Sequence, residues 1–359
     1  MSFHQDYLNT RYFSNLDGVR SLCILAVIWH HVPHPDNLPR VMGRGFLGVD
    51  MFFVVSGFLI VTLLLREQGT YKTINLSQFY LRRILRTFPA YYGILGLFLV
   101  LYSLQSPSEN RQQFFELLPI YLTLTSNFFQ QQAANFGILW SLATEEQFYF
   151  FWPWVQKFAS PQVLWGIWGG FFGLNQLINF GVIRPWLEKV FGVVHLEILD
   201  ASFTPILLGI ALAYGLHFPP TFSWLAKMMR HPWTPFGFLL VLLALGQWGG
   251  SDISGLPRLL IQGVMTLWLG SLVLPRPHCL TPMLENKIIA RLGIVSYGVY
   301  LYHMWCIHAV TTVLGKINLA TWWLIFMGSV VVSYGVAEIS FRWWEKPFLR
   351  LKPKRQVPV

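Results

Sequence analysis

Long apolar stretches recur along almost the whole chain of 359 residues. A helix needs about 20 mostly apolar residues to cross the hydrocarbon core of a bilayer. Ten stretches approach this length: 19–34, 46–65, 88–104, 139–157, 162–180, 203–217, 234–248, 258–274, 292–313 and 320–341. We therefore predict an all-α fold, a polytopic transmembrane helical bundle with about ten spanning helices.

The composition agrees with a membrane protein. Hydrophobic residues make up 54% of the chain and charged residues 12%, about half the charged fraction of a soluble domain. The net charge of +10 comes from short basic clusters between apolar stretches, so we expect membrane lipids and no nucleic acid as partners. Cys23, Cys279 and Cys306 follow no motif spacing, so we expect no metal site, no disulfide and no permanently bound cofactor.

Lysine and arginine in the connecting segments predict the orientation of the helices. Four basic segments can all be cytoplasmic if residues 114–129 do not cross the membrane: 66–86, 218–232, 275–291 and 342–355. Both termini are then cytoplasmic. The start of the chain is polar, so we expect no cleavable signal. We expect an N-terminal arm over 1–15, a membrane domain over 16–348 and a basic tail over 349–359, in the plasma or inner membrane.

Arg20 and His31 both lie within the first apolar stretch. Eleven residues make about three helical turns, so the two side chains share one face and lie roughly 16 Å apart along the axis. Titratable groups are costly inside a bilayer and usually functional there. The alternative is that Arg20 extends to lipid phosphates and His31 faces the outer interface.

Three carboxylates are expected at a depth similar to that of His31. Asp50 opens the second stretch, and Glu145 and Glu146 open the fourth. A carboxylate beside an imidazole fixes its tautomer and stabilises its protonated form. The alternatives are that Asp50 caps a helix and that the glutamates only favour a helix N-terminus. Gly57 is expected to allow close helix packing.

Two further groups combine polar and aromatic residues. Arg83 and Arg86 precede the third stretch and share a helix face, which suits phosphate groups, although basic residues at a cytoplasmic boundary also arise from topology alone. Tyr302 and His303 lie within a late stretch. His303 is either a site residue or a buried histidine with its hydrogen bonds satisfied. We expect Glu345 to pair with a nearby cation.

Taken in order, these residues resemble the acyltransferase-3 family of integral membrane O-acyltransferases. The resemblance rests on ordered motifs: L-D-G-x-R (16–20), R-x10-H (20–31), G-V-D-x-F-F-V-x-S-G-F (48–58), R-x-x-R (83–86), W-S-L-A-x-E-E-Q-F-Y (140–149), S-Y-G-x-Y-L-Y-H (296–303) and E-K-P-F (345–348). Tyr302 replaces a common tryptophan and Ala143 a common serine. Some relatives carry a C-terminal SGNH domain, which we do not expect here.

The resemblance implies that residues 16–348 form an acyltransferase-3 domain. Such an enzyme transfers an acetyl or other short acyl group from acyl-CoA to a hydroxyl of a carbohydrate, glycolipid or secondary-metabolite acceptor. On this basis Arg20, Arg83 and Arg86 bind the CoA phosphates. Tyr302 and His303 bind substrate.

His31 is predicted to be the general base, oriented or tuned by Asp50, Glu145 or Glu146. A covalent acyl-histidine relay across the membrane is a variant of this mechanism. Two other functions are compatible with buried charges: a transporter of a small anionic or glycan-related solute, and a non-catalytic membrane partner. Against the transporter, the sequence shows no repeat of broken helices. Against the partner, both Arg20 and His31 are present.

Overall fold

The computed structural model describes residues 3–35, 37–129, 133, 135–183, 185–186, 189, 203–248, 250 and 253–353. Over these residues the chain forms helices, turns and loops and no strand, which confirms the all-α class. Lys354 and Arg355 of the predicted basic tail, and the tail from 354 to 359, lie outside the described residues.

Each of the ten apolar stretches contains a helix with similar bounds. The helices are α2 (Asn15–His31), α3 (Leu47–Tyr71), α4 (Leu76–Leu104), α6 (Leu139–Phe158), α7 (Pro161–Asn179), α9 (Thr204–His217), α11 (Thr234–Trp248), α12 (Leu256–Val273), α15 (Ser296–Lys316) and α16 (Trp322–Ser340). The largest difference is in α4, which begins twelve residues before the predicted 88. Its first turns are polar and basic, so hydropathy alone did not include them in the stretch.

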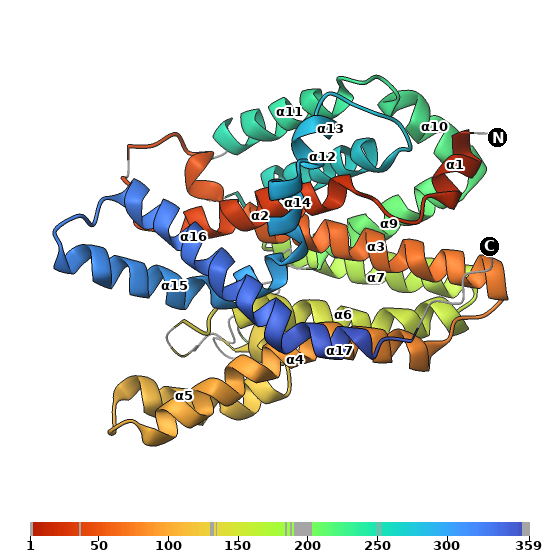
Figure 1. Cartoon of the computed structure of the whole chain (residues 1–359). Helices are drawn as coiled ribbons and strands as arrows, with labels where there is room; N and C mark the ends of the chain where they lie inside the picture. The colour runs from red at the N-terminus through yellow and green to blue at the C-terminus, as the bar shows by residue number, and fades with distance from the viewer. Residues whose placement is uncertain are drawn as a thin grey trace. The chain divides into compact units, whose positions relative to one another are not determined.

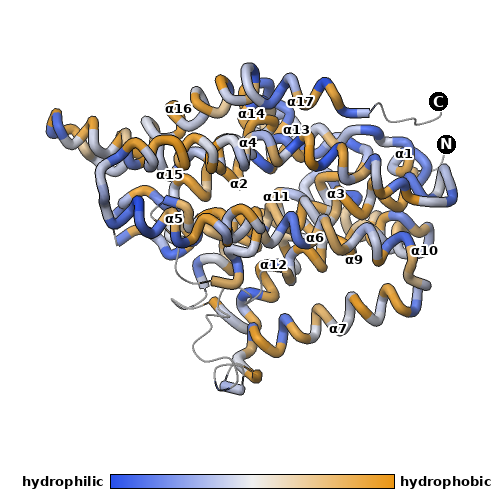
Figure 2. The backbone as a smooth tube through the Cα atoms, turned by 90° about the horizontal axis from the view of Figure 1, so that it is seen from below, coloured by the Kyte–Doolittle hydropathy of each residue, from blue (hydrophilic) through white to orange (hydrophobic). Residues whose placement is uncertain are grey.

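Among the described residues, four helical segments are long and apolar enough to cross a membrane: α3, α4, α12 and the run Trp322–Arg350. A fifth appears if α9 and α10 (Pro219–Met229), which meet at a bend of 104°, count as one broken span. Hydrophobic residues predominate along most of the helices, and hydrophilic residues gather towards helix ends and connections (Figure 2). The remaining helices are shorter or more polar, so the predicted count of about ten spans is not confirmed.

Two compact units divide the chain, and the first comprises residues 1–73 and 155–294. Helices α3 and α9 lie side by side in it (Figure 1). Their backbones approach closely because each contributes a glycine: a Cβ on Gly57 would overlap the Ile206 carbonyl, and one on Gly209 would overlap the Val54 carbonyl. Gly57 therefore has the packing role predicted for it.

The first unit also contains short helical elements. They are α1 (Phe3–Asn9), the 3₁₀ turn η1 (Met42–Arg44), α13 (Thr281–Leu284) and α14 (Lys287–Ile294). The predicted N-terminal arm is partly helical and is held against α3. Arg66 of α3 donates hydrogen bonds to the carbonyl oxygens of Thr10, at 2.5 Å, and Tyr7, at 2.9 Å. Its guanidinium also lies over the Tyr7 and Phe13 rings.

The second unit comprises residues 74–154 and 295–359. It contains α4, α5 (Glu109–Leu122), the turn η2 (Ser126–Phe128), most of α6, α15, α16, the π-helical turn η4 (Phe341–Glu345) and α17 (Lys346–Arg350). With 14 residues, α5 is about 21 Å long, shorter than the hydrocarbon core of a bilayer. The helix α9 has the same length of 14 residues, so the expectation that residues 114–129 do not cross stays a prediction.

The C-terminal segment of this unit is attached to α4. The Trp344 indole donates a hydrogen bond of 2.7 Å to the carbonyl oxygen of Pro89. That indole packs directly over Gly93, where a Cβ would come within 2.7 Å of Nε1. Short α17 then packs along α4. A π-helical turn often marks a functional position in a helix, and here it delivers Glu345 to a buried position.

Candidate active site

His31 is the last residue of α2, and one hydrogen bond determines the tautomer of its ring. Nδ1 lies 2.9 Å from the carbonyl oxygen of Val27. A carbonyl oxygen can only accept, so Nδ1 carries the proton and Nε2 carries the lone pair of the neutral ring. An imidazole held in this way is ready to accept a proton at Nε2.

Arg20 lies eleven residues earlier on the same helix, at about 16 Å along its axis. Its Nη1 forms an ion pair of 3.2 Å with Asp17, one turn away, and Tyr12 also donates a hydrogen bond to Asp17. About a fifth of the Arg20 side chain remains exposed. The arginine and the histidine therefore occupy opposite ends of α2, as the spacing predicted.

His30 has different surroundings from His31. Its ring packs edge-on against Phe46, with the ring centroids 5.4 Å apart, and against His31 at 5.2 Å. The guanidinium of Arg258 lies over the same Phe46 ring, 5.1 Å from its centroid. Phe46 thus contacts both His30 of α2 and an arginine of α12.

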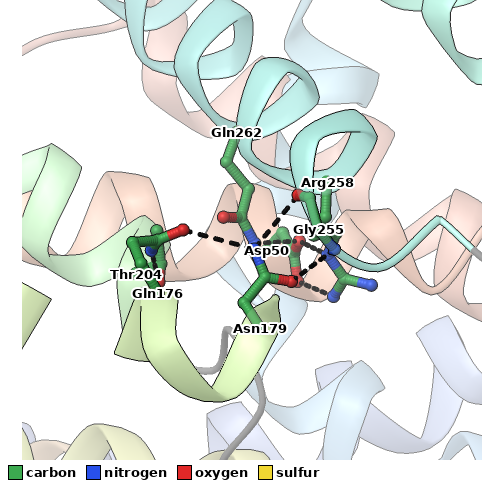
Figure 3. Close-up of polar contacts among 7 residues, drawn as sticks. All are labelled: Asp50, Gln176, Asn179, Thr204, Gly255, Arg258 and Gln262. Carbon is green, nitrogen blue, oxygen red and sulfur yellow. Dashed lines mark hydrogen bonds and ion pairs between the residues drawn. The ribbon is translucent and has the colours of Figure 1, made fainter. Parts of the chain in front are cut away.

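Arg258 connects this region to a buried carboxylate, that of Asp50 on α3 (Figure 3). Arg258 donates to both Asp50 oxygens, from Nε at 2.7 Å and from Nη2 at 2.8 Å. Gln262, one turn further along α12, donates a third hydrogen bond of 2.9 Å. The Asp50 side chain is 3% exposed and that of Arg258 is 20% exposed, so the charge of Asp50 is balanced inside the first unit by a bidentate pair.

The start of α12, which carries Arg258, is itself fixed by a side chain of α7. The Asn179 amide accepts a hydrogen bond of 2.9 Å from the Gly255 N–H and donates one of 3.1 Å to the Gly255 carbonyl. Gly255 has a φ of 70°, a conformation that side chains with a Cβ rarely adopt. Nearby, Gln176 donates a hydrogen bond of 2.9 Å to Thr204 (Figure 3).

The contacts of Asp50 differ from those expected. Over the described residues no hydrogen bond joins Asp50 to His31, and the bonds that Asp50 does make go to Arg258 and Gln262. Nor does Asp50 cap α3, where Phe46 is the N-cap residue. Sequence reasoning overlooked Arg258 and Gln262. The signal that singled out Arg20, a cation inside an apolar stretch, applies equally to Arg258.

In the second unit, Arg83 is enclosed by residues of α6. Its guanidinium stacks 3.5 Å from the centroid of the Tyr149 ring, and its Nη2 lies 3.8 Å from Glu146. The Tyr149 hydroxyl donates a hydrogen bond of 3.0 Å to Glu145. The two glutamates therefore point to different partners, and Arg86, one turn along α4, is exposed.

The late motif and the C-terminal motif also meet in the second unit. The Tyr302 hydroxyl is 2.8 Å from the hydroxyl of Ser340, which donates a hydrogen bond of 3.1 Å to the buried Glu345. His303 is fully buried, with Nδ1 donating to the Tyr300 carbonyl at 2.5 Å. The roles of Tyr302 and His303 toward a substrate stay predictions.

No three His, Cys, Asp or Glu side chains in the described part of the chain are grouped as metal ligands would be. The family model for the acyltransferase-3 domain, described as an acyltransferase domain, matches residues 13–338. The chain belongs to the acyltransferase-3 family. This confirms the family indicated by the ordered motifs.

Several curated acyltransferase-3 relatives cover nearly all of this chain. A putative O-acetyltransferase of Staphylococcus aureus strain COL is 27% identical over 375 residues, which are 95% of this chain and 58% of the relative. The peptidoglycan O-acetyltransferase OatA of Listeria monocytogenes is 27% identical over 367 residues, 94% of this chain and 56% of the relative. A putative peptidoglycan O-acetyltransferase of Bacillus subtilis strain 168 is 27% identical over 370 residues, 94% and 55%.

The chain thus spans somewhat more than half the length of these relatives. No solved structure matches the chain.

Proposed function

We propose that this protein is a membrane O-acyltransferase that moves an acetyl or other short acyl group from acyl-CoA to a hydroxyl of a carbohydrate or glycolipid acceptor. Membership of the acyltransferase-3 family and the names of the O-acetyltransferase relatives support the reaction class. The peptidoglycan O-acetyltransferases among them support a carbohydrate acceptor. The observation that carries the mechanism is the hydrogen bond from His31 to the Val27 carbonyl.

In this mechanism His31 is the general base. Its Nε2 accepts the proton of the acceptor hydroxyl while that oxygen attacks the thioester carbonyl carbon. The C–O bond forms, the C–S bond breaks, and the proton passes from His31 to the departing CoA sulfur. The Val27 carbonyl keeps the Nδ1 proton in place and stabilises the imidazolium as it forms. A covalent acyl-histidine is the variant in which Nε2 itself attacks the thioester.

The proposed topology has ten crossing helices with both termini in the cytoplasm. On this topology Arg20 lies near the cytoplasmic end of α2 and His31 near its outer end. Arg20 of the first unit then attracts the CoA phosphates at the inner side, and the pantetheine arm bridges the distance along α2. Arg83 and Arg86 of the second unit are further candidates for binding the CoA phosphates. The acceptor reaches His31 from the outer side, so the acyl group crosses the bilayer and CoA does not.

The experiment that tests this function supplies labelled acetyl-CoA to membranes of cells with and without the protein and profiles their glycans. We expect label in an ester-linked, alkali-labile glycan fraction only when the protein is present. Label that stays in acetyl-CoA in both preparations would contradict the proposal. Release of a solute from loaded vesicles without acyl transfer would favour the transporter.

A further inference from the structure

Helix α10 of the first unit turns sharply away from α9 at the residue that joins them. Phe218 has an extended backbone, and Pro219 and Pro220 follow it at the start of α10. Proline disfavours a helical conformation in the residue before it and lacks the N–H that would continue α9, so the two helices meet at 104°. On the proposed topology α9 crosses the membrane beside α3. The 11 residues of α10 therefore run close to the membrane plane on the cytoplasmic side.

One face of α10 packs on the rest of the first unit. Its buried residues recur at helical spacing: Phe222, Leu225, Ala226 and Met229. The N-terminal helix α1 lies against this face (Figure 1). The centroid of the Phe222 ring is 4.5 Å from that of His4 and 5.6 Å from that of Tyr7. These contacts determine which face of α10 is directed outward.

The outward face of α10 consists of an apolar flank and a basic flank. Trp224 is 66% exposed and Met228 is 40% exposed, and because they are four residues apart they are neighbours on the apolar flank. Lys227 and Arg230 are also exposed, and because they are three residues apart they are neighbours on the basic flank. At 3.6 residues per turn the two flanks are centred roughly 110° apart. This separation of an aromatic residue from cations is typical of a helix that lies in a membrane interface.

No carboxylate balances the basic flank within the part of the chain that the structure describes. The sequence from 203 to 248 contains no Asp or Glu, and over the described residues neither Lys227 nor Arg230 forms an ion pair. Anionic lipid headgroups supply the opposite charge at a membrane surface. Tryptophan is enriched at the same depth, because its ring is apolar and its N–H is polar.

We propose that α10 is a membrane-surface helix that binds anionic phospholipids in the cytoplasmic interface. Trp224 and Met228 lie among the lipid chains, and Lys227 and Arg230 contact the headgroup phosphates. In this arrangement α9 and α10 are not one broken span, because α10 adds almost no depth. The inference is independent of the acyl transfer reaction. It also places the N-terminal arm, which packs on Phe222, at the membrane surface.

Two fluorescent probes on α10 test its depth. In a full chain whose native cysteines are replaced by alanine, Met228→Cys and Ser223→Cys are each labelled with an environment-sensitive fluorophore. Each labelled chain is placed, one copy per disc, in nanodiscs of phosphatidylcholine and phosphatidylglycerol. We expect a lipid spin-labelled at carbon 5 of its chain to quench the Met228 probe, and aqueous iodide to reach it poorly. The probe at Ser223, an exposed residue beside the basic flank, is the matched control, and iodide should quench it.

Three results would overturn the proposed depth. Stronger quenching of the Met228 probe by a lipid labelled at carbon 16 than at carbon 5 would put α10 in the hydrocarbon core, as part of a broken span. Equal quenching of both probes by iodide would put both flanks in water. Shielding of the Met228 probe only when two copies share a disc would assign the outward face to a second copy of this chain.

A second measurement tests the preference for anionic headgroups. Spin-labelled phosphatidylglycerol should quench the Met228 probe at about fivefold lower mole fraction than spin-labelled phosphatidylcholine, the worth of roughly one basic residue at a membrane surface. Lys227→Gln with Arg230→Gln should remove this difference. Lys316→Gln, which changes an exposed lysine of α15, should keep it. Equal quenching by the two lipids in the parent chain, or an unchanged difference in the double variant, would overturn the binding of anionic lipid by the basic flank.

Discussion

Asp50 of α3 and Arg258 of α12 form a bidentate ion pair, with Nε and Nη2 of the arginine 2.7 Å and 2.8 Å from the two carboxylate oxygens. The two residues are 208 positions apart in the chain, and their pair joins α3 to α12. Through the Phe46 ring, which Arg258 covers and His30 contacts, it reaches the end of α2 that carries His31. Asp50 is therefore linked to His30 through the side chains of Arg258 and Phe46.

Breaking this pair should destabilise the first unit. Asp50→Asn leaves the Arg258 charge without its partner, and Arg258→Gln leaves the buried Asp50 charge without its own. Each change should cost about 3–5 kcal/mol. The double variant Asp50→Asn with Arg258→Gln should recover a large part of that loss, because neither charge remains. Thermal unfolding of the four proteins in nanodiscs measures the coupling, and strictly additive losses would show that the pair is not a unit.

The two arginines of the R-x-x-R motif should differ in what their loss affects. Arg86→Ala should raise the KM for acetyl-CoA about tenfold with little change in thermal stability, because Arg86 is exposed. Arg83→Ala should also destabilise the protein, by about 1–2 kcal/mol, since it removes the contact with the Tyr149 ring. Steady-state kinetics and unfolding midpoints check both. An unchanged KM in both variants would show that the two arginines only mark the cytoplasmic boundary of α4 and do not bind acetyl-CoA.

His278, in the connection between α12 and α13, should make stability depend on pH. Its side chain is buried, and burial, followed by repulsion from Arg276, lowers its pKa against smaller opposing contributions from the Leu272 backbone and Glu285. The unfolded chain therefore binds this proton at higher pH than the folded chain does. The contribution of neutral His278 to the free energy of unfolding is complete above pH 6.5, the ordinary pKa of histidine. This contribution is lost as the pH falls below that value.

Replacing this histidine by leucine should remove that component of the pH dependence. Unfolding midpoints at pH 7.5 and 5.5 should differ less for His278→Leu than for wild type. His308→Leu, a change of an exposed histidine on α15, is the matched control and should retain the wild-type difference. Equal pH sensitivity in wild type and His278→Leu would contradict the prediction.

The proposed topology places residues 35–44 outside and residues 67–80 inside. In a background with Cys23, Cys279 and Cys306 replaced by alanine, Asn37→Cys and Thr73→Cys introduce exposed thiols at the two positions. A membrane-impermeant thiol reagent added to intact cells should label the first and not the second. The reverse pattern would put His31 on the cytoplasmic side and remove the argument that the acyl group crosses the bilayer.

Hydropathy was sufficient to locate the main helices, because the bilayer requires long apolar segments whatever their partners are. Every predicted stretch contains a helix, and α11 has the predicted bounds of 234–248. It did not predict short α10 or its bend of 104° from α9, nor the docking of the N-terminal arm on Arg66. These depend on tertiary contacts that no local pattern records.

The sequence placed the candidate site residues on helices but did not predict the residues that contact them. Motif spacing selected Arg20, His31, Asp50 and Arg83, each of which lies on a helix as expected. Their partners come from distant segments, as Arg258 does for Asp50. Spacing can place two groups on one helix face, but it says nothing about which other helix packs there.

Acyl transfer by the purified protein, with and without His31, tests the central claim most directly. The full chain and its His31→Gln and His30→Gln variants would be reconstituted with labelled acetyl-CoA and a glycan acceptor, after matched unfolding midpoints confirm folding. We predict that His31→Gln loses transfer by about 100-fold or more, the usual worth of a general base. His30→Gln should retain most activity, because that ring packs against Phe46. Full activity of His31→Gln, or loss of activity only in His30→Gln, would contradict the account.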